Sequence, residues 1–294
     1  MPWSISSFVP PVLLAALALL PAAQEPAGRL VSVGTHRLWI ECAGEGAPTI
    51  VVEVGGGSNG AEWSQTVDDL RREARVCIYS RAGYPRSEPG PLPRDAGREA
   101  DELAALVEGA SVTRPFLLVA HSLGALNALV LADRHRDWLS GLVLLDAPPL
   151  SWMSGRAFPG IRVNTEASVA RMRQRAAQLR AAADSTGPVR AAAVEALASE
   201  IEAMFARTQE LVSAVRSLGD LPLLVVSGGR ANPAVYGDQA EAFTGAWIEQ
   251  GRAFAALSSR GNFVLVAESG HNLPQEVPDR VLASVREMLS RLRQ

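Results

Sequence analysis

The sequence of 294 residues has only two cysteines, no excess of basic residues and, with a net charge of −3, no strong charge of either sign. Its arginines are dispersed rather than gathered into a basic stripe, so the electrostatic signature of a nucleic-acid-binding protein is missing. It also lacks an apolar run of the about 20 residues that a membrane-spanning helix needs. These absences argue against a nucleic-acid partner and against a stable membrane span in the mature chain.

The two cysteines, Cys42 and Cys77, each lie in a strand-like run. Neither their spacing nor their surroundings match a zinc site or a CxxC redox motif. A disulfide bond is one interpretation, because the N-terminal segment described next favours export to an oxidising compartment. Two buried free thiols are the other interpretation, and the sequence does not choose between them.

The N-terminal segment has features of a secretory signal. An apolar block at residues 9–20 precedes Pro21-Ala22-Ala23-Gln24, as the apolar and cleavage regions of a signal peptide do. We expect a signal peptide over residues 1–23, a mature chain that begins within residues 22–28, and export to the periplasm or the exterior. No Lys or Arg precedes the block, which leaves a buried or anchoring segment as the alternative.

The rest of the chain alternates between strand-like and helix-like segments. With 48% hydrophobic residues it can bury a large core. The expected strands are residues 29–33, 36–42, 49–54, 75–79, 116–120, 141–146, 222–227 and 262–267. This succession predicts an α/β fold, with a mainly parallel sheet of roughly eight strands and helices on both faces.

Between residues 150 and 218 the strands stop, and an Ala-, Arg- and Glu-rich stretch has helical spacing. We interpret residues 150–218 as a helical cap inserted into one domain, whose core comprises residues 29–149 and 219–294. Several apolar cap residues either line a substrate pocket or simply pack against one another: Trp152, Met153, Phe158, Met172, Met204 and Phe205. No binding role is assigned to them.

A candidate nucleophile lies in the segment Ala120-His121-Ser122-Leu123-Gly124, which joins a predicted strand to a predicted helix. On such a sharp turn a serine hydroxyl is exposed to a base, and N–H groups at the start of the helix face the same space. We therefore predict Ser122 as a nucleophile and the N–H of Leu123 as a donor to the developing oxyanion. A chance match on a Ser-Gly turn is the alternative.

A candidate base follows the last predicted strand. Only four histidines occur in the chain, and His271 lies between that strand and the C-terminal helix. The order along the chain, serine before histidine, is the one expected of a nucleophile and its base in this architecture. We predict that His271 takes the proton of Ser122 and later activates water.

Three glycines, Gly55, Gly56 and Gly57, directly follow the strand that ends at residue 54. Glycines let the main chain approach a substrate carbonyl closely, so we predict the N–H of Gly57 as the second oxyanion donor. A phosphate-binding loop is the alternative, but neither a Gly-Lys-Ser/Thr motif nor the G-x-G-x-x-G spacing is present.

Together these residues resemble the α/β-hydrolase fold superfamily, in particular its esterase, lipase and aminopeptidase-like branch with a helical cap. The resemblance spans residues 29–292 and includes Trp63 and the turn at residues 79–87. In that turn Ser80 replaces the family's usual Asp, and Pro85 replaces a Gly. The turn shapes the wall of the site, so these departures concern local geometry and not the nucleophile.

The family usually places the acid that orients the histidine after the strand before last, but here that strand leads to Ser227-Gly228-Gly229-Arg230-Ala231-Asn232, without a carboxylate. Asn232 stands near the usual position. Some family members carry the acid after the preceding strand, where this chain has Asp146. The resemblance therefore implies Asp146, with Asp238 as the second candidate and a purely structural carboxylate as the alternative reading of Asp146.

The resemblance implies a serine hydrolase that cleaves a small-molecule ester or related acyl substrate through an acyl-enzyme, without a cofactor or metal. Dehalogenases and epoxide hydrolases of this fold need Asp where this chain has Ser122. An amide hydrolase similar to proline iminopeptidase is one alternative, and it needs a cap carboxylate to hold the substrate amine: Glu166, Glu195, Glu200 or Glu202. A non-catalytic binding module is the other, and no feature indicates an oligomeric state.

Overall fold

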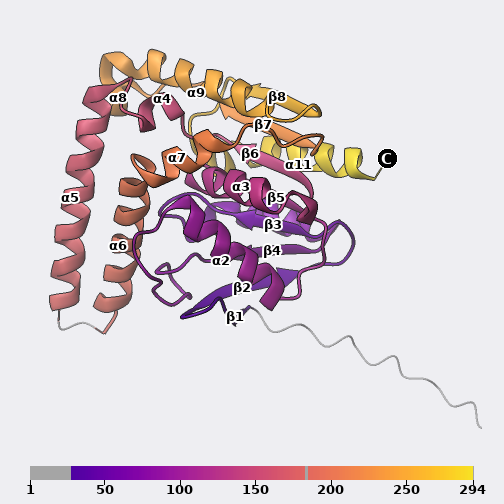
Figure 1. Cartoon of the computed structure of the whole chain (residues 1–294), viewed down its shortest axis with the longest axis horizontal. Helices are drawn as coiled ribbons and strands as arrows, with labels where there is room; N and C mark the ends of the chain where they lie inside the picture. The colour runs from indigo at the N-terminus through magenta and orange to yellow at the C-terminus, as the bar shows by residue number, and fades with distance from the viewer. Residues whose placement is uncertain (1–27, 183–184, 294) are drawn as a thin grey trace, which may run out of the picture.

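The computed structural model describes residues 28–182 and 185–293, so the predicted signal peptide lies outside the described residues. The strands form one eight-stranded sheet in the order β1-β2-β4-β3-β5-β6-β7-β8 (Figure 1). In chain order they are β1 (Arg29–Ser32), β2 (Arg37–Ala43), β3 (Ile50–Glu53), β4 (Val76–Tyr79), β5 (Phe116–His121), β6 (Leu139–Leu145), β7 (Leu223–Gly228) and β8 (Gly261–Val266). Strand β2 is antiparallel to β1 and β4, and the other neighbouring pairs are parallel. The predicted α/β class is confirmed.

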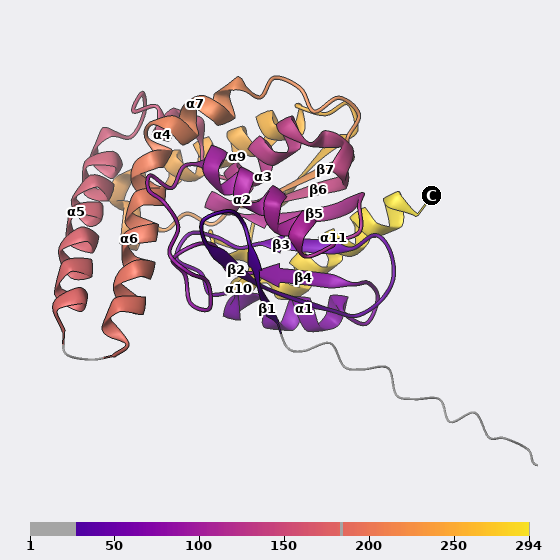
Figure 2. The ribbon, with the colours of Figure 1, turned by 60° about the horizontal axis from the view of Figure 1, so that its bottom comes forward.

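Helices cover both faces of this sheet. Outside the predicted cap they are α1 (Ser64–Leu70), α2 (Ala96–Gly109), α3 (Leu123–Arg134), α8 (Pro233–Tyr236), α9 (Ala240–Ala255), α10 (Leu273–Glu276) and α11 (Pro278–Leu292). Figure 2 shows α2 and α3 on one side of the sheet and α1 and α11 on the other. Each of these four helices therefore packs one face against a hydrophobic layer on the sheet.

Strand β5 illustrates how the sequence produces two such layers. Phe116, Leu118 and Ala120 belong to the hydrophobic cluster that includes residues of α2 and α3. The intervening Leu117 and Val119 belong to the cluster that includes residues of α1 and α11. Successive side chains of a strand point to opposite faces, so an uninterrupted apolar run suits a strand that is covered on both sides.

Between β6 and β7 the described residues form helices only: α4 (Leu150–Met153), α5 (Pro159–Ala181), α6 (Gly187–Met204) and α7 (Arg207–Ala214). Helices α5 and α6 pack on each other as a hairpin that stands beside the sheet in Figure 1. Most of α5 is exposed, whereas Ala191, Ser199 and Glu200 of α6 are buried. Within residues 28–182 and 185–293, no helix combines the length and the apolar character needed to cross a membrane.

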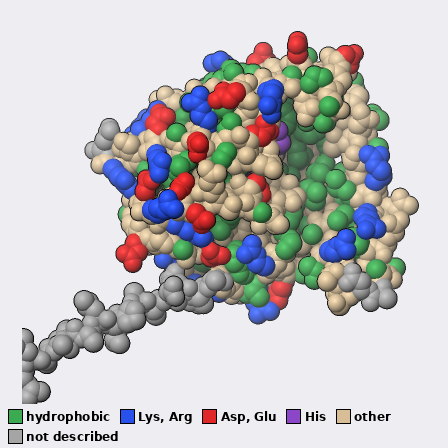
Figure 3. All heavy atoms as spheres, turned by 180° about the vertical axis from the view of Figure 1, so that it is seen from behind, with side chains coloured by type: hydrophobic (Ala, Val, Ile, Leu, Met, Phe, Trp, Pro, Cys, Tyr) green, Lys and Arg blue, Asp and Glu red, His purple; other side chains and the backbone are tan. Residues whose placement is uncertain are grey.

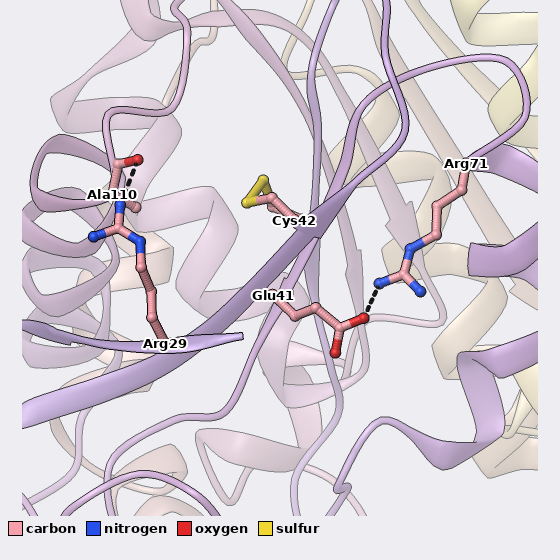
Figure 4. The surroundings of a disulfide bond; sticks show 6 residues. Arg29, Glu41, Cys42, Arg71 and Ala110 are labelled. Atoms are coloured by element: carbon pink, nitrogen blue, oxygen red, sulfur yellow. Dashed lines mark hydrogen bonds and ion pairs between the residues drawn. A yellow bond between two sulfur atoms is a disulfide. The ribbon is translucent and has the colours of Figure 1, made fainter. Parts of the chain in front are cut away.

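The two cysteines form a disulfide bond, which answers the question that the sequence left open. Cys42 and Cys77 lie directly opposite each other in the antiparallel pair of β2 and β4. Figure 4 shows the bond flanked by an ion pair of Arg71 with Glu41 and by a hydrogen bond from Arg29 to a main-chain carbonyl. The cross-link spans 35 residues of sequence. For a loop of that length, the lost entropy of the unfolded chain corresponds to about 4 kcal/mol of stabilisation.

Candidate active site

Ser122 lies on a strained turn between β5 and α3, with φ 56° and ψ −125°. Residues other than glycine rarely adopt such a positive φ. The N–H of Ser122 donates to the carbonyl oxygen of Leu145, 2.8 Å away, which fixes the turn to β6. Gly124 is required because a Cβ there would lie 2.5 Å from the carbonyl oxygen of Val54. The small residue two positions after the serine thus allows β3 to approach the turn.

Three side chains from distant parts of the sequence form a hydrogen-bonded chain. Ser122 Oγ lies 2.9 Å from His271 Nε2, and His271 Nδ1 lies 2.6 Å from Asp146 Oδ2. A carboxylate only accepts hydrogen bonds, so Nδ1 carries the hydrogen and Nε2 of the neutral ring can accept from the serine. The side chain of His271 is 45% exposed. The structure therefore brings the predicted nucleophile, base and acid together at a position that solvent can reach.

Asp146 follows β6 directly, and its side chain is buried. Its second oxygen, Oδ1, accepts a hydrogen bond from the N–H of Gly228, 2.8 Å away. Burial raises the pKa of Asp146 above its ordinary value, and the hydrogen bond with His271 opposes this effect. Asp238, the second candidate for the acid, is exposed in the short 3₁₀ helix Gly237–Gln239. Asn232, near the family's usual acid position, lines the same cavity as His271.

His121, the residue before Ser122, contacts the main chain of His271. Its Nε2 lies 2.9 Å from the carbonyl oxygen of His271, and the two rings are 5.1 Å apart. A carbonyl oxygen only accepts, so Nε2 of His121 is the donor. Burial lowers the pKa of His121 to about 3, which keeps the ring neutral. No role for His121 was predicted from the sequence, although its place directly before Ser122 could have indicated one.

The two predicted oxyanion donors differ in availability. Leu123 is the first residue of α3, so its N–H has no partner within the helix. The N–H of Gly57, in contrast, donates to the hydroxyl of Tyr84, 2.9 Å away. Because that N–H is already engaged, the structure argues against Gly57 as the second donor. The neighbouring Gly56 lies against Leu123, since a Cβ on Gly56 would be 3.6 Å from the Leu123 Cβ.

A cluster of charged side chains lies beneath the glycine loop, which we define as residues 55–58. This buried charge cluster comprises Glu53, Arg81, Arg94, Glu99, Glu102 and Glu200, each at most 7% exposed. Burial raises the pKa of Glu53 to about 7, and burial together with the charge of Glu200 raises that of Glu99. Burial alone would lower the pKa of Arg81, but the carboxylates around it raise it overall. In the sequence, the local indication of this cluster is Glu53, a charged residue within an otherwise apolar strand.

A cavity of about 480 Å³ opens beside His271 and Asp146, at the carboxyl ends of β7 and β8. The ring of Trp247 lies in its wall, 5.1 Å from the ring of His271. Trp152 of the cap packs against Phe205 and Phe243, with ring centroids 5.3 and 5.5 Å apart. Within the part of the chain that the structure describes, no cluster of three or more His, Cys, Asp or Glu residues is suited to hold a metal ion.

Comparisons with known proteins agree with this architecture. The model of the Alpha/beta hydrolase family matches residues 50–284. YqjL, an uncharacterized protein of Bacillus subtilis (strain 168), is 25% identical over 246 residues, which are 83% of this chain and 85% of YqjL. A thermophilic esterase from Thermogutta terrifontis superposes with a TM-score of 0.68 at 24% identity, over 91% of this chain and 99% of the esterase. An enol-lactonase from Burkholderia xenovorans LB400 superposes with a TM-score of 0.66 at 22% identity, over 89% of this chain and 100% of the enol-lactonase. At such identities the structural matches show the fold alone.

Proposed function

The chain belongs to the alpha/beta hydrolase family, and we propose that it is a serine hydrolase that cleaves a small-molecule carboxylic ester, or a related acyl substrate, through an acyl-enzyme. One observation carries the proposal: the hydrogen bonds of 2.9 Å and 2.6 Å that join Ser122, His271 and Asp146. A free serine hydroxyl is a poor nucleophile, and an imidazole oriented by a carboxylate is an arrangement that activates it.

In the proposed reaction, Ser122 Oγ attacks the acyl carbon while its proton passes to His271 Nε2. Asp146 holds the Nδ1–H and stabilises the imidazolium. His271 then gives the proton to the leaving alcohol oxygen as the C–O bond breaks, which leaves the acyl group on Ser122. A water molecule, deprotonated by the same nitrogen, attacks the acyl carbon, and Ser122 regains its proton when the carboxylic acid departs.

The developing oxyanion needs donors next to Ser122. We assign the N–H of Leu123 and, in place of Gly57, the N–H of Gly56. Gly56 is supported by its packing against Leu123 and by the bond that already occupies the N–H of Gly57. Two donors in a site of low dielectric are the usual means of stabilising such a charge.

Ester hydrolysis is favoured over aminopeptidase activity by the state of the candidate cap carboxylates. Each is paired with an arginine: Glu166 with Arg162, Glu195 with Arg180, Glu202 with Arg173, and Glu200 with Arg81. Glu200 is the buried one, and it also accepts a hydrogen bond from Tyr84. Glu200 is thus engaged and offers little to a substrate amine, and the other three are not among the residues that line the cavity beside His271.

The surface beside the site suits an apolar acyl group. In Figure 3, hydrophobic side chains gather between the α5–α6 hairpin and the rest of the molecule, and a histidine lies at the edge of this area. Exposed apolar surface of this kind commonly marks a binding site. We therefore expect esters with apolar acyl chains to be better substrates than acetyl esters.

Export of the protein remains our proposal. The disulfide between Cys42 and Cys77 supports it, because disulfides persist mainly in oxidising compartments. Fractionation of cells that express the full chain, with detection of a shortened product outside the cytoplasm, tests it.

A fluorophosphonate probe tests the enzymatic proposal most directly. We expect the wild-type protein to be labelled and Ser122→Ala to remain unlabelled. A wild-type protein that resists labelling and hydrolyses no member of a panel of p-nitrophenyl esters and aminoacyl amides would instead support a binding module. The same panel separates ester from amide cleavage.

A further inference from the structure

We propose that Tyr84 and Glu200 are positioning residues that couple helix α6 of the cap to the glycine loop, so that the oxyanion site is complete only when α6 is docked. This inference rests on the proposed function, since it concerns the loop to which we assign an oxyanion donor. Three sets of contacts carry it.

The first is a relay of hydrogen bonds from the loop backbone to the cap. The N–H of Gly57 donates to the Tyr84 hydroxyl at 2.9 Å, and that hydroxyl donates to Glu200 Oε2 at 2.7 Å. The directions are fixed, because a main-chain N–H only donates and a carboxylate only accepts. Tyr84 thus uses its single hydrogen toward α6 and a lone pair toward the loop.

The second is the guanidinium of Arg81, which bridges the same two parts. It donates to the carbonyl oxygens of Val54 and Gly55 at 2.6 and 3.0 Å. It also donates to both oxygens of Glu200, from Nε at 3.0 Å and from Nη2 at 3.3 Å. Arg81 is 3% exposed and Glu200 is 1% exposed. Separating Arg81 from Glu200 would leave buried charges without a partner. Because this is energetically costly, the contact between them is maintained.

The third is direct packing of α6 on the loop and on the neighbouring turn. A Cβ on Gly83 would lie 2.8 Å from the Cβ of Ala196, so α6 approaches this turn as closely as a glycine allows. The side chain of Leu197 lies 3.3 Å from the place a Cβ would occupy on Gly56 and on Gly57. Leu197 and Glu200 are three residues apart and therefore lie on one face of the helix.

These contacts end beside the reacting atoms. A Cβ on Gly55 would lie 3.4 Å from the Cβ of Ser122, so the loop has little room to move without changing the space above the serine. Hydrogen-bond donors for an oxyanion must be positioned to within a fraction of an ångström. We infer that displacement of α6 releases the loop and lowers the rate of the chemical step more than substrate binding.

Two tyrosine variants make a matched test. Tyr84 and Tyr79 are 3% and 4% exposed, and each hydroxyl contacts a carboxylate of the buried charge cluster, Glu200 and Glu53 respectively. The Tyr79 hydroxyl donates to Glu53, which precedes the glycine loop, and not to the loop itself. Removing either hydroxyl therefore perturbs the cluster, but only Tyr84→Phe removes the link to Gly57.

With a p-nitrophenyl ester, we expect Tyr84→Phe to lower kcat by about 10- to 100-fold, below the loss that follows outright removal of an oxyanion donor, with KM changed by less than about threefold. Tyr79→Phe should retain kcat within about threefold. Both variants should lose similar thermal stability. Equal kcat values for the two variants would overturn the proposal.

Hydrogen exchange gives a readout that does not depend on activity. Peptides that contain residues 54–59 should lose amide protection in Tyr84→Phe and keep it in Tyr79→Phe, and unchanged protection in Tyr84→Phe would overturn the coupling. If the wild-type protein hydrolyses no ester, the proposed function fails while this measurement still decides the coupling. If Tyr84→Phe does not fold, Glu200→Ala serves instead, because it removes both the acceptor of the Tyr84 hydroxyl and the carboxylate that binds Arg81; unchanged protection of residues 54–59 in that variant would likewise overturn the coupling.

Discussion

The two sides of the site are built in different ways. On the nucleophile side, Ser122 and His271 meet through one hydrogen bond, and the imidazole is 45% exposed. On the glycine-loop side, Arg81 and Glu200 are held by several short contacts and are almost completely buried. Reacting groups must be accessible to substrate and water. The hydrogen bonds and ion pairs that only hold a backbone are stronger when they are buried at low dielectric. The reacting groups are thus accessible and the supporting groups are buried, and variants on each side of the site test this difference.

The largest effect is expected at the nucleophile. Ser122→Ala removes the attacking oxygen, so kcat for a p-nitrophenyl ester should fall by about 10⁴-fold or more. Stopped-flow or plate-reader assays measure this loss, and an unchanged melting temperature shows that the fold is intact. Substantial residual turnover would move the nucleophile elsewhere.

A loss of similar kind is expected at the acid. Asp146→Asn keeps the shape but favours the wrong tautomer of His271, so kcat should fall by about 10² to 10⁴-fold. Asp238→Asn is the control and should retain nearly full activity, since this residue is exposed and lies outside the hydrogen-bonded chain. The reverse result would assign the acid to Asp238.

On the loop side the principal expected loss is in stability. Arg81→Met leaves buried carboxylates without their cation and should lower the free energy of unfolding by about 3–5 kcal/mol. Arg180→Met, which breaks an ion pair on the exposed cap surface, should lower it by less than about 1 kcal/mol. Urea denaturation of both variants measures the contrast, and similar values for the two would remove the distinction between the buried and exposed pairs.

The last expected effect is confined to low pH and concerns His121, a buried ring on the nucleophile side. Its pKa is lowered to about 3 by burial, from an ordinary value of 6.5. As pH falls below 6.5, the unfolded chain binds a proton at this ring and the folded chain does not. The free energy of unfolding therefore falls by up to about 1.4 kcal/mol for each unit by which pH drops, until pH approaches the pKa of His121 in the folded protein.

His121→Gln should remove this dependence. The difference in unfolding free energy between wild type and variant, measured at several pH values from 6.5 down to 4 in guanidinium chloride, should change in favour of the variant as pH falls. Because the wild type and His121→Gln share all their other titratable groups, taking this difference cancels the contributions of those groups. A constant difference would show that His121 titrates normally.

The sequence indicated which side chains meet on the nucleophile side, because the signals there are local. Ser122 stands between an apolar strand and a helix, and the place of His271 after the last strand follows from the alternation of elements. Asp146 was implied by the family resemblance, as a carboxylate at a strand end, and the structure places it beside His271. Parallel strands bring their carboxyl ends to one edge of the sheet, so these positions converge without any knowledge of tertiary contacts.

The loop side could not be predicted in this way. Glu200 lies in a helix rich in Ala and Glu, where the sequence offers several similar glutamates and no sign of which one is buried. Its partners, Arg81 and Tyr84, precede it by more than a hundred residues, and the docking of α6 that joins them is a tertiary event. The same holds for Gly57, because its N–H donates to the hydroxyl of Tyr84, a contact that no local pattern in the sequence indicates.

The disulfide has a practical consequence for all of these measurements. It fastens β4 to β2, and β4 runs directly into the turn that carries Arg81. Protein made in a reducing cytosol would lack this fastening, and its support for the glycine loop would be tested in a weakened state. Production with a periplasmic leader, followed by a thiol titration that finds no free cysteine, is therefore the proper starting point for comparing variants.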